Sequence, residues 1–187
     1  AMMIKRYAVQ ERVNTIRVKV DCDGLGVGVY DNLYDAAGKI MEEAHTERCR
    51  LAKRDPEYAA GWPDSQDIPP LDLEIVECHF GGAGGKVDED DPVEYSNSTG
   101  LMWGKVRQFL KDGRLQLADD DALFSQLTNR RYMVSKDGKI ELERKEAMKK
   151  RGLQSPDIAD ALALALYDPE EPLPFGDSGL GKDSYWR

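Results

Sequence analysis

The segment 155–166 constrains the fold most strongly, because it predicts a buried helix with a well-defined start. Ser155 suits the N-cap position, since its hydroxyl can accept a hydrogen bond from a free N–H group of the first turn. Pro156 suits the first helical position, where its missing N–H is no loss. From Ile158 onward the residues are nearly all Ala and Leu, and a helix that is apolar nearly all round lies inside a protein. The sequence therefore predicts a core helix here.

Two carboxylates stand at the start of this predicted helix. Asp157 falls in the first turn, where the helix dipole favours negative charge. Asp160 follows three residues later on the same face of the helix, among Ala and Leu. An ionised carboxylate in apolar surroundings is costly unless a cation meets it. Asp157 and Asp160 therefore either decorate the exposed first turn of a core helix or bind a metal ion with a partner from elsewhere in the chain.

Length and composition define a broad class of protein. The chain has 187 residues, of which 41% are hydrophobic and 33% are charged, as expected for a soluble globular protein with its own core. The sequence shows no signal peptide, and no run approaches the roughly 20 apolar residues of a membrane span. The number of cysteines is 3, without a close-spaced pair, which favours reduced thiols and argues against a zinc site. We therefore expect an intracellular protein that is neither secreted nor bound to a membrane.

The charge balance narrows the possible partners. The net charge is −9, from 26 basic and 35 acidic residues, and a protein that coats nucleic acid would be basic. A nuclease remains compatible with this balance, because an acidic metal site can lie beside a local basic strip. Basic residues do gather between the middle of the chain and the predicted core helix. The candidate DNA-binding residues among them are Arg131, Lys136, Lys139, Lys149, Lys150 and Arg151.

A further carboxylate of interest, Asp21, follows the segment 15–20, which alternates apolar and basic residues and is typical of a strand. The spaced glycines after it, Gly24, Gly26 and Gly28, predict a tight turn into a helix. Open α/β sheets carry functional groups at the carboxyl ends of their strands, which makes Asp21 a candidate ligand. As a phosphate-binding turn the pattern is weak, since it lacks the Lys-Ser/Thr of a P-loop. A nucleotide-binding protein that uses this turn stays open as an alternative.

The remaining segments predict a mixed α/β protein. In chain order we expect a helix from 27 to 33, helical sequence over 36–58, a strand over 71–80, a flexible connection over 81–91, a helix from 95 to 110, a short strand at 115–117, a helix capped by 119–121, a β-hairpin with strands 131–135 and 139–143, and a helical turn at 146–150. The β-hairpin thus comes shortly before the core helix at 155–166. The acidic triplet 119–121 is better explained by the helix that it precedes than by metal binding.

Two motifs in this order carry a resemblance to a known family. The first is VDCDGLGVGVYDNL, residues 20–33, at the end of the predicted strand. The second is KRGLQSPDIADALALA, residues 150–165, which leads into the core helix. With LMW at 101–103 and the hairpin between them, these motifs resemble the nuclease domain of the large terminase subunits of tailed bacteriophages. The resemblance covers about residues 15–167.

The resemblance implies a fold and a function. The fold would be RNase H-like, a mixed sheet flanked by helices. The activity would be that of a two-metal-ion endonuclease that uses Mg²⁺ or Mn²⁺ to cut concatemeric double-stranded viral DNA during packaging, in the cytoplasm of the bacterial host. Asp21 and Asp160 would be metal ligands, with Asp157 as an auxiliary ligand. Partners implied by the family are the ATPase part of the terminase, the small terminase subunit and the portal protein.

One departure from the family pattern concerns the beginning of the chain. The family places its first catalytic Asp on an earlier strand, whereas residues 1–14 contain no Asp, and no P-loop ATPase domain is present. We therefore expect an incomplete metal site with weak or no activity in this chain alone. The expected parts are a lead-in at 1–14, with 1–2 interpreted as a cloning remnant, a partial nuclease domain at 15–167 and a flexible tail at 168–187. A non-catalytic interaction module or decayed prophage remnant of the packaging motor is the alternative.

Overall fold

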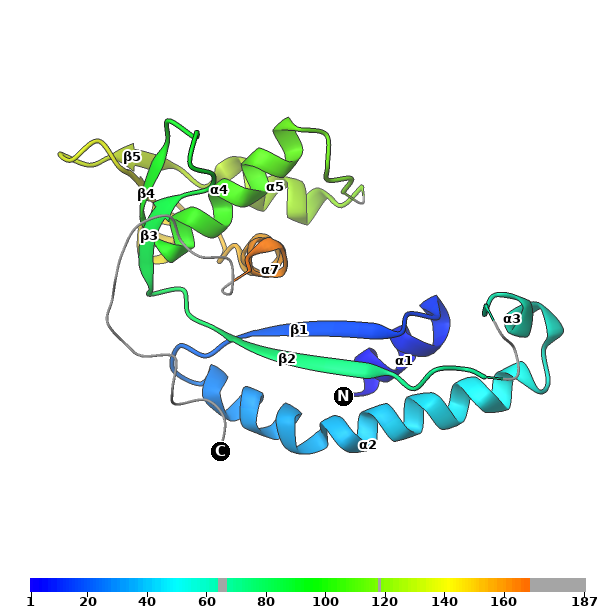
Figure 1. Ribbon diagram of the computed structural model, residues 1–187. Coiled ribbons are helices and arrows are strands. Elements are labelled where there is room, and N and C mark those ends of the chain that lie inside the picture. The colour runs from blue at the N-terminus through cyan, green and yellow to red at the C-terminus, as the bar shows by residue number, and fades with distance from the viewer. Residues whose placement is uncertain (64–66, 118, 169–187) are drawn as a thin grey trace. The chain divides into compact units, whose positions relative to one another are not determined.

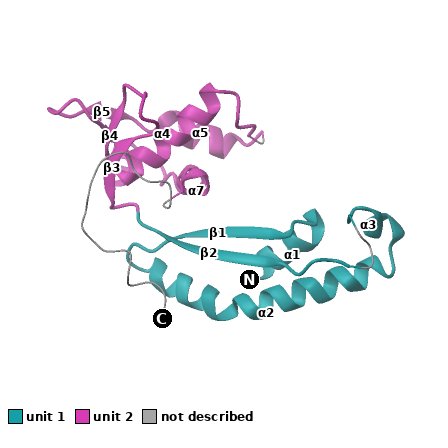
Figure 2. Cartoon of the chain, in the orientation of Figure 1, with its two compact units in different colours: residues 1–79 teal, residues 80–187 magenta. Residues whose placement is uncertain are grey.

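The computed structural model describes residues 1–63, 67–117 and 119–168, and the chain divides into two compact units, residues 1–79 and 80–187 (Figure 2). The predicted limits at 14/15 and 167/168 stay predictions, and the tail beyond Asp168 lies outside the described residues. Within the described ranges, no helix has the length and apolar character needed to cross a membrane.

The first unit is a two-stranded parallel sheet with helices packed against it. Its elements are α1 (Met2–Glu11), β1 (Thr15–Asp21), α2 (Gly26–Ala52), α3 (Pro56–Ala60) and β2 (Asp72–Cys78). β1 and β2 pair in parallel from Thr15 opposite Asp72 to Asp21 opposite Cys78. Parallel neighbours need a long crossover connection, and α2 provides it by running along the sheet (Figure 1). Both strands therefore end at the same edge, next to the start of α2.

The segment that the sequence analysis treated as a lead-in forms α1, because it packs against α2. Ala8 is fully buried with Ala44 of α2 and with Leu71. The guanidinium of Arg48, also fully buried, donates to the Ala8 carbonyl over 3.0 Å and to the Val13 carbonyl. These carbonyls lie near the end of α1, where helical C=O groups lack partners within the helix. A long-range cap therefore stabilises a helix that short-range sequence patterns do not indicate.

The long helix of this unit begins where it was predicted and differs from its prediction at its end. α2 runs without a break from Gly26 to Ala52, over most of the helical sequence expected at 27–33 and 36–58. The predicted stretch 36–58 is too long, because Pro56 cannot continue a helix and starts α3 instead. The Asp55 carboxylate caps α3 by accepting from the backbone N–H groups of Glu57 over 2.9 Å and Tyr58 over 3.1 Å.

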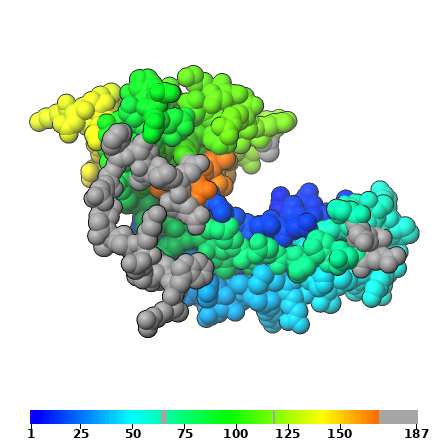
Figure 3. Space-filling model, in the orientation of Figure 1, coloured from blue at the N-terminus to red at the C-terminus, as the bar shows by residue number. Residues whose placement is uncertain are grey.

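The second unit is a four-stranded mixed sheet with helices. Its elements are β3 (Ala83–Lys86), β4 (Glu94–Asn97), α4 (Ser98–Lys111), α5 (Asp121–Asn129), β5 (Tyr132–Val134), β6 (Ile140–Leu142), α6 (Lys145–Lys150) and α7 (Asp157–Leu166). The strand order is β3-β4-β6-β5, with β4 and β6 parallel and the outer pairs antiparallel. The β5–β6 hairpin turns at Gly138, whose φ is 78°, and its residues stand out in yellow from this unit (Figure 3). The predicted mixed α/β class and the hairpin before the last helix are confirmed.

The stretch from 81 to 97 overturns two predictions. Instead of a flexible connection and a helix starting at Tyr95, β3 and β4 form an antiparallel pair. A Cβ at Gly84 would lie 2.0 Å from the Tyr95 carbonyl oxygen, so glycine there permits the close approach of the two strands. The helix begins only after Asn97, whose side chain accepts from the Gly100 N–H over 2.9 Å. Residues 115–117 are irregular and not the predicted strand, because so short an alternation does not distinguish a strand from a loop.

The start of α7 is capped differently from the sequence expectation. The helix begins at Asp157, and the Ser155 hydroxyl donates to the Asp157 carboxylate over 2.5 Å, so Ser155 is not the N-cap. The side-chain oxygen of Gln126 on α5 accepts instead from the N–H groups of Ile158 over 2.9 Å and Ala159 over 3.0 Å. The prediction of a core helix is confirmed on one side of α7, where Ala159 is fully buried, whereas Ile158 is 45% exposed.

Candidate functional site

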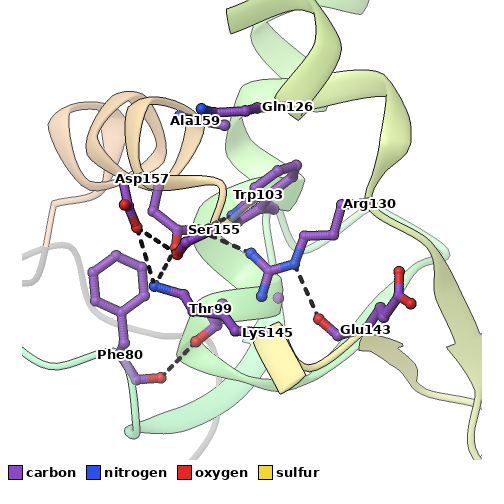
Figure 4. Close-up of polar contacts among 12 residues, drawn as sticks. Phe80, Thr99, Trp103, Gln126, Arg130, Glu143, Lys145, Ser155, Asp157 and Ala159 are labelled. Atoms are coloured by element: carbon purple, nitrogen blue, oxygen red, sulfur yellow. Dashed lines mark hydrogen bonds and ion pairs between the residues drawn. The ribbon is translucent and has the colours of Figure 1, made fainter. Parts of the chain in front are cut away.

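Asp160 is a buried charged residue of the second unit, and it is only 5% exposed. Its Oδ1 accepts from Nε1 of Trp103 on α4 over 2.9 Å and from Nη1 of Arg130 over 2.9 Å. Its Oδ2 lies 2.8 Å from Nζ of Lys145 on α6. Figure 4 shows Trp103, Arg130 and Lys145 converging at the start of α7. The cations that a buried carboxylate requires thus come from two other segments of the chain.

Arg130 is itself held on several sides. Its side chain is 5% exposed, and its guanidinium carbon lies 4.7 Å from the centre of the Trp103 ring. Its Nε donates to the backbone carbonyl of Glu143 over 3.2 Å. Burial lowers the pKa of Arg130 from its ordinary value, against the opposing attraction of Asp160. We call Asp160, Arg130 and Trp103 the Asp160 lock. The sequence analysis did not single out Arg130 and did not find the lock.

Lys145 lies on the outer side of the lock, between the two carboxylates of α7. Its ammonium is 2.8 Å from Asp160 Oδ2 and 3.9 Å from Asp157 Oδ1, and its side chain is 44% exposed. Asp160 Oδ2 is buried and accepts no hydrogen bond of normal geometry from the residues that the structure describes. The ammonium therefore occupies a place where two carboxylates attract a cation. The structure brings the predicted residues Asp157 and Asp160 together there.

The carboxylates of Asp157 and Asp160 fit one edge of a divalent-cation site. Hard cations such as Mg²⁺ bind carboxylate oxygens and keep several waters, and Oδ2 of Asp160 is a buried oxygen that already faces a cation. These two carboxylates alone do not make a complete metal centre. Within the described ranges, no group of three or more His, Cys, Asp or Glu side chains could hold a metal ion. Asp157 and Asp160 therefore fit a metal site to which other carboxylates must contribute.

Asp21 belongs to the first unit, at the carboxyl end of β1, and is half-buried. Its Oδ1 accepts from the backbone N–H of Asp23 over 3.1 Å. A Cβ at Gly26 would lie 1.6 Å from the Asp21 carbonyl oxygen, so only glycine lets α2 begin directly against the end of the strand. The predicted strand-end position of Asp21 is confirmed. Asp21 and the carboxylates of α7 lie in different units, and each is described within its own.

His79 directly follows β2, whereas the sequence analysis placed it within the predicted strand 71–80. Its Nδ1 lies 3.0 Å from Oδ1 of Asp23 and its Nε2 lies 3.1 Å from Oε1 of Glu77. The hydrogen bond with Asp23, together with the negative charge of Glu77, raises the pKa of His79 above its ordinary value, against an opposing effect of burial. The sequence shows Asp23 and Glu77 as acidic residues near the ends of two predicted strands. That both lie beside His79 follows only once β1 and β2 are known to be parallel neighbours.

The stability of the first unit should fall as pH rises through the folded-state pKa of His79. A raised folded-state pKa means that the stabilisation is fully present below the unfolded-state value, about 6.5, and is lost above the folded-state value. The effect should be small, because the His79 side chain is 53% exposed. Thermal unfolding of wild type and His79→Gln against pH checks this, with the difference in unfolding temperature shrinking at alkaline pH. A His79 pKa at or below 6.5 in an NMR titration contradicts it.

The predicted DNA-binding residues differ in how strongly neighbouring carboxylates hold them. Lys139 pairs with Glu94 over 2.5 Å. Arg151 is exposed but bonds Glu143 Oε1 over 2.8 Å and donates to the Asn129 carbonyl over 2.9 Å. The other four candidates, which are also exposed, are Arg131, Lys136, Lys149 and Lys150. These four are therefore the better candidates for contact with a phosphate backbone, and their role stays a prediction.

No family model and no curated protein matches this chain. Among solved structures, the chain is similar to the nuclease domain of the large terminase subunit gp2 of bacterial virus Sf6, with a TM-score of 0.42, 19% sequence identity, and coverage of 88% of this chain and 70% of that one. A point mutant of that domain with manganese gives a TM-score of 0.44 at 18% identity, with the same coverage. The same mutant with manganese and beta-thujaplicinol gives 0.46 at 17% identity, again with the same coverage.

Proposed function

We propose that this chain is the nuclease part of a bacteriophage DNA-packaging terminase large subunit, with an RNase H-like fold, that cuts concatemeric double-stranded DNA. The observation that carries the proposal is the arrangement at the start of α7. A buried oxygen of Asp160, Oδ2, and the carboxylate of Asp157 face the same cation, the Lys145 ammonium. They do so within the sequence motif that resembles the terminase nucleases. Asp21, at the carboxyl end of β1, is the proposed ligand from the first unit.

The proposed roles follow from the positions of these side chains. Asp157 and Asp160 of the second unit and Asp21 of the first are the proposed ligands of Mg²⁺ or Mn²⁺, which would activate water and neutralise charge on the phosphodiester. Lys145 must then move aside, and its half-exposed side chain leaves it room to do so. The exposed basic residues around the hairpin and α6 would bind phosphates of the duplex and fix the register of the protein on it. Such phosphate contacts carry no sequence information.

The proposed setting is the packaging complex in the cytoplasm of the bacterial host. There the ATPase part of the terminase, the small terminase subunit and the portal protein would be the partners. Because Asp157 and Asp160 fit only one edge of a metal centre, we propose that the chain alone binds metal weakly and cleaves DNA slowly or not at all.

Asp160→Asn is expected to abolish the Mn²⁺ binding of this chain, because it removes the negative charge of the only buried carboxylate at the site. Calorimetry of wild type, Asp160→Asn and the control Asp88→Asn measures this. Asp88 is exposed and lies in the connection between β3 and β4, so its substitution should leave the binding unchanged. Circular dichroism confirms that each variant is folded. A wild-type chain without a Mn²⁺-dependent signal would exclude the proposed metal role.

A non-catalytic interaction module is the second candidate, and the Asp160 lock favours it. Two donors on Oδ1 and an ammonium at Oδ2 would also suit a carboxylate with a purely structural role. Plasmid nicking in Mn²⁺ by wild type and by Asp160→Asn separates the two functions. Nicking by wild type that the substitution abolishes supports the nuclease. Inactivity of wild type, with Mn²⁺ binding absent as well, supports the module.

A further inference from the structure

We infer that Trp103 and Arg130 are positioning residues that orient the Asp160 carboxylate so that Oδ2, and not Oδ1, faces the cation position that the Lys145 ammonium holds. The inference rests on the proposed metal site and names two residues that act on it from the side away from the ion. Both donors bind the same oxygen, Oδ1, at 2.9 Å. Turning the plane of the carboxylate out of this orientation would leave both donors without an acceptor in a buried place, where an unpaired donor is costly.

The two donors are themselves fixed, which is what lets them orient a third group. Arg130 stacks on the Trp103 ring at 4.7 Å and its Nε is bonded to the Glu143 carbonyl over 3.2 Å. Trp103 is carried by α4, and Asp160 by α7, the helix against which α4 packs. The position of Oδ2 therefore depends on the packing of two helices and on the backbone next to the hairpin. Such outer partners of a metal ligand commonly change metal affinity about 10–100-fold when they are lost.

Charge and geometry must be separated in the test, because the positive charge of Arg130 by itself repels a metal ion. Trp103→Phe and Arg130→Lys both keep the net charge of the chain. Phenylalanine lacks the indole N–H, and lysine cannot reproduce the planar fork that bonds Oδ1 and the Glu143 carbonyl together. A positioning role predicts weaker binding in both variants. A role through charge alone predicts no change.

The experiment measures the Mn²⁺ affinity of the folded chain by calorimetry for wild type, Trp103→Phe, Arg130→Lys and the control Trp62→Phe. Trp62 is buried in the first unit with Tyr58 and Ile68, so the control makes the same chemical change in the other unit. We expect about 10-fold or greater loss of affinity in the first two variants and none in the control. Thermal unfolding is recorded in parallel. A purely structural role would lower the unfolding temperature and leave the affinity of the folded protein unchanged.

A spectroscopic readout accompanies the affinities. Mn²⁺ held by Oδ2 should broaden the indole N–H signal of Trp103 in a ¹⁵N-resolved NMR spectrum more strongly than that of Trp62, and the two Phe variants assign these signals. In Arg130→Lys the selective broadening should require more Mn²⁺. Equal affinities in wild type and both lock variants overturn the inference and leave the proposed metal site intact. A wild-type chain that binds no Mn²⁺ overturns the proposed metal site and, with it, the inference.

Discussion

Replacing Arg130 by Met is expected to lower the free energy of unfolding of the second unit by about 3 kcal/mol, the lower end of the cost of breaking a buried ion pair. The substitution leaves the Asp160 carboxylate buried, with the indole N–H of Trp103 as the remaining donor on Oδ1. Lys145, 2.8 Å from Oδ2, keeps the cost from reaching the upper end of that range. Urea unfolding of the full chain, followed by circular dichroism and tryptophan fluorescence, measures the change.

The chain offers a matched control next in sequence. Arg131 is exposed, so Arg131→Met should change stability by no more than about 0.5 kcal/mol. The double variant Arg130→Met/Asp160→Leu should recover much of the lost stability, because an apolar pair leaves no buried charge unpaired. If Arg130→Met proves as mild as the control, the lock contributes nothing to stability. If the double variant is as unstable as the sum of its parts, the two residues are not coupled.

Replacing Gly26 by Ala is expected to destabilise the first unit by about 3 kcal/mol, the upper end of the usual cost of overpacking. The new Cβ would lie 1.6 Å from the carbonyl oxygen of Asp21, and because that atom belongs to the backbone, no side-chain rotation can relieve the contact. Either α2 must start later or the end of β1 must move. Asp21 stands at this junction, so the variant should also disturb its position.

Gly28→Ala is the control for this prediction. Gly28 lies in the same helix two residues further on, and a Cβ there would meet nothing within 4 Å. Alanine favours the helix over glycine by about 1 kcal/mol, so this variant should be slightly more stable than wild type. Thermal unfolding of the two variants should therefore shift in opposite directions. No loss of stability in Gly26→Ala would mean that the strand–helix junction does not depend on Gly26. An equal loss in Gly28→Ala would mean that the effect is not specific to Gly26.

Short-range patterns predicted the elements whose signals lie within a few residues. The strand before Asp21 shows an alternation of apolar and basic residues, and the hairpin shows a glycine at its turn with strand-forming residues on either side. The apolar helix from 157 to 166 was visible as a run of Ala and Leu. In each case one segment carried both the pattern and the conformation that it indicates.

Elements that depend on a distant partner were missed or misplaced. The glycine-rich stretch around Gly84 has the composition of a loop, and it becomes β3 because β4 supplies hydrogen bonds to it. α1 is stabilised near its C-terminal end by Arg48, whose guanidinium donates to the carbonyl of Ala8, 40 residues earlier in the chain. At α7, the helix N-terminus is capped by Gln126 from another helix rather than by the local Ser155. Propensity and capping rules take no account of such partners.

The candidate site divides in the same way. The sequence by itself determined that Asp160 follows Asp157 on one face of a core helix, and that a carboxylate so placed requires a cation, because burial without one is too costly. Only the tertiary structure decided which cations meet it and on which oxygen. Arg130 is 30 residues away and Trp103 is 57 residues away, and both reach Oδ1 only when α4, α7 and the segment before the hairpin pack together. Periodicity reports the face of a helix, whereas the partners on that face are set by packing.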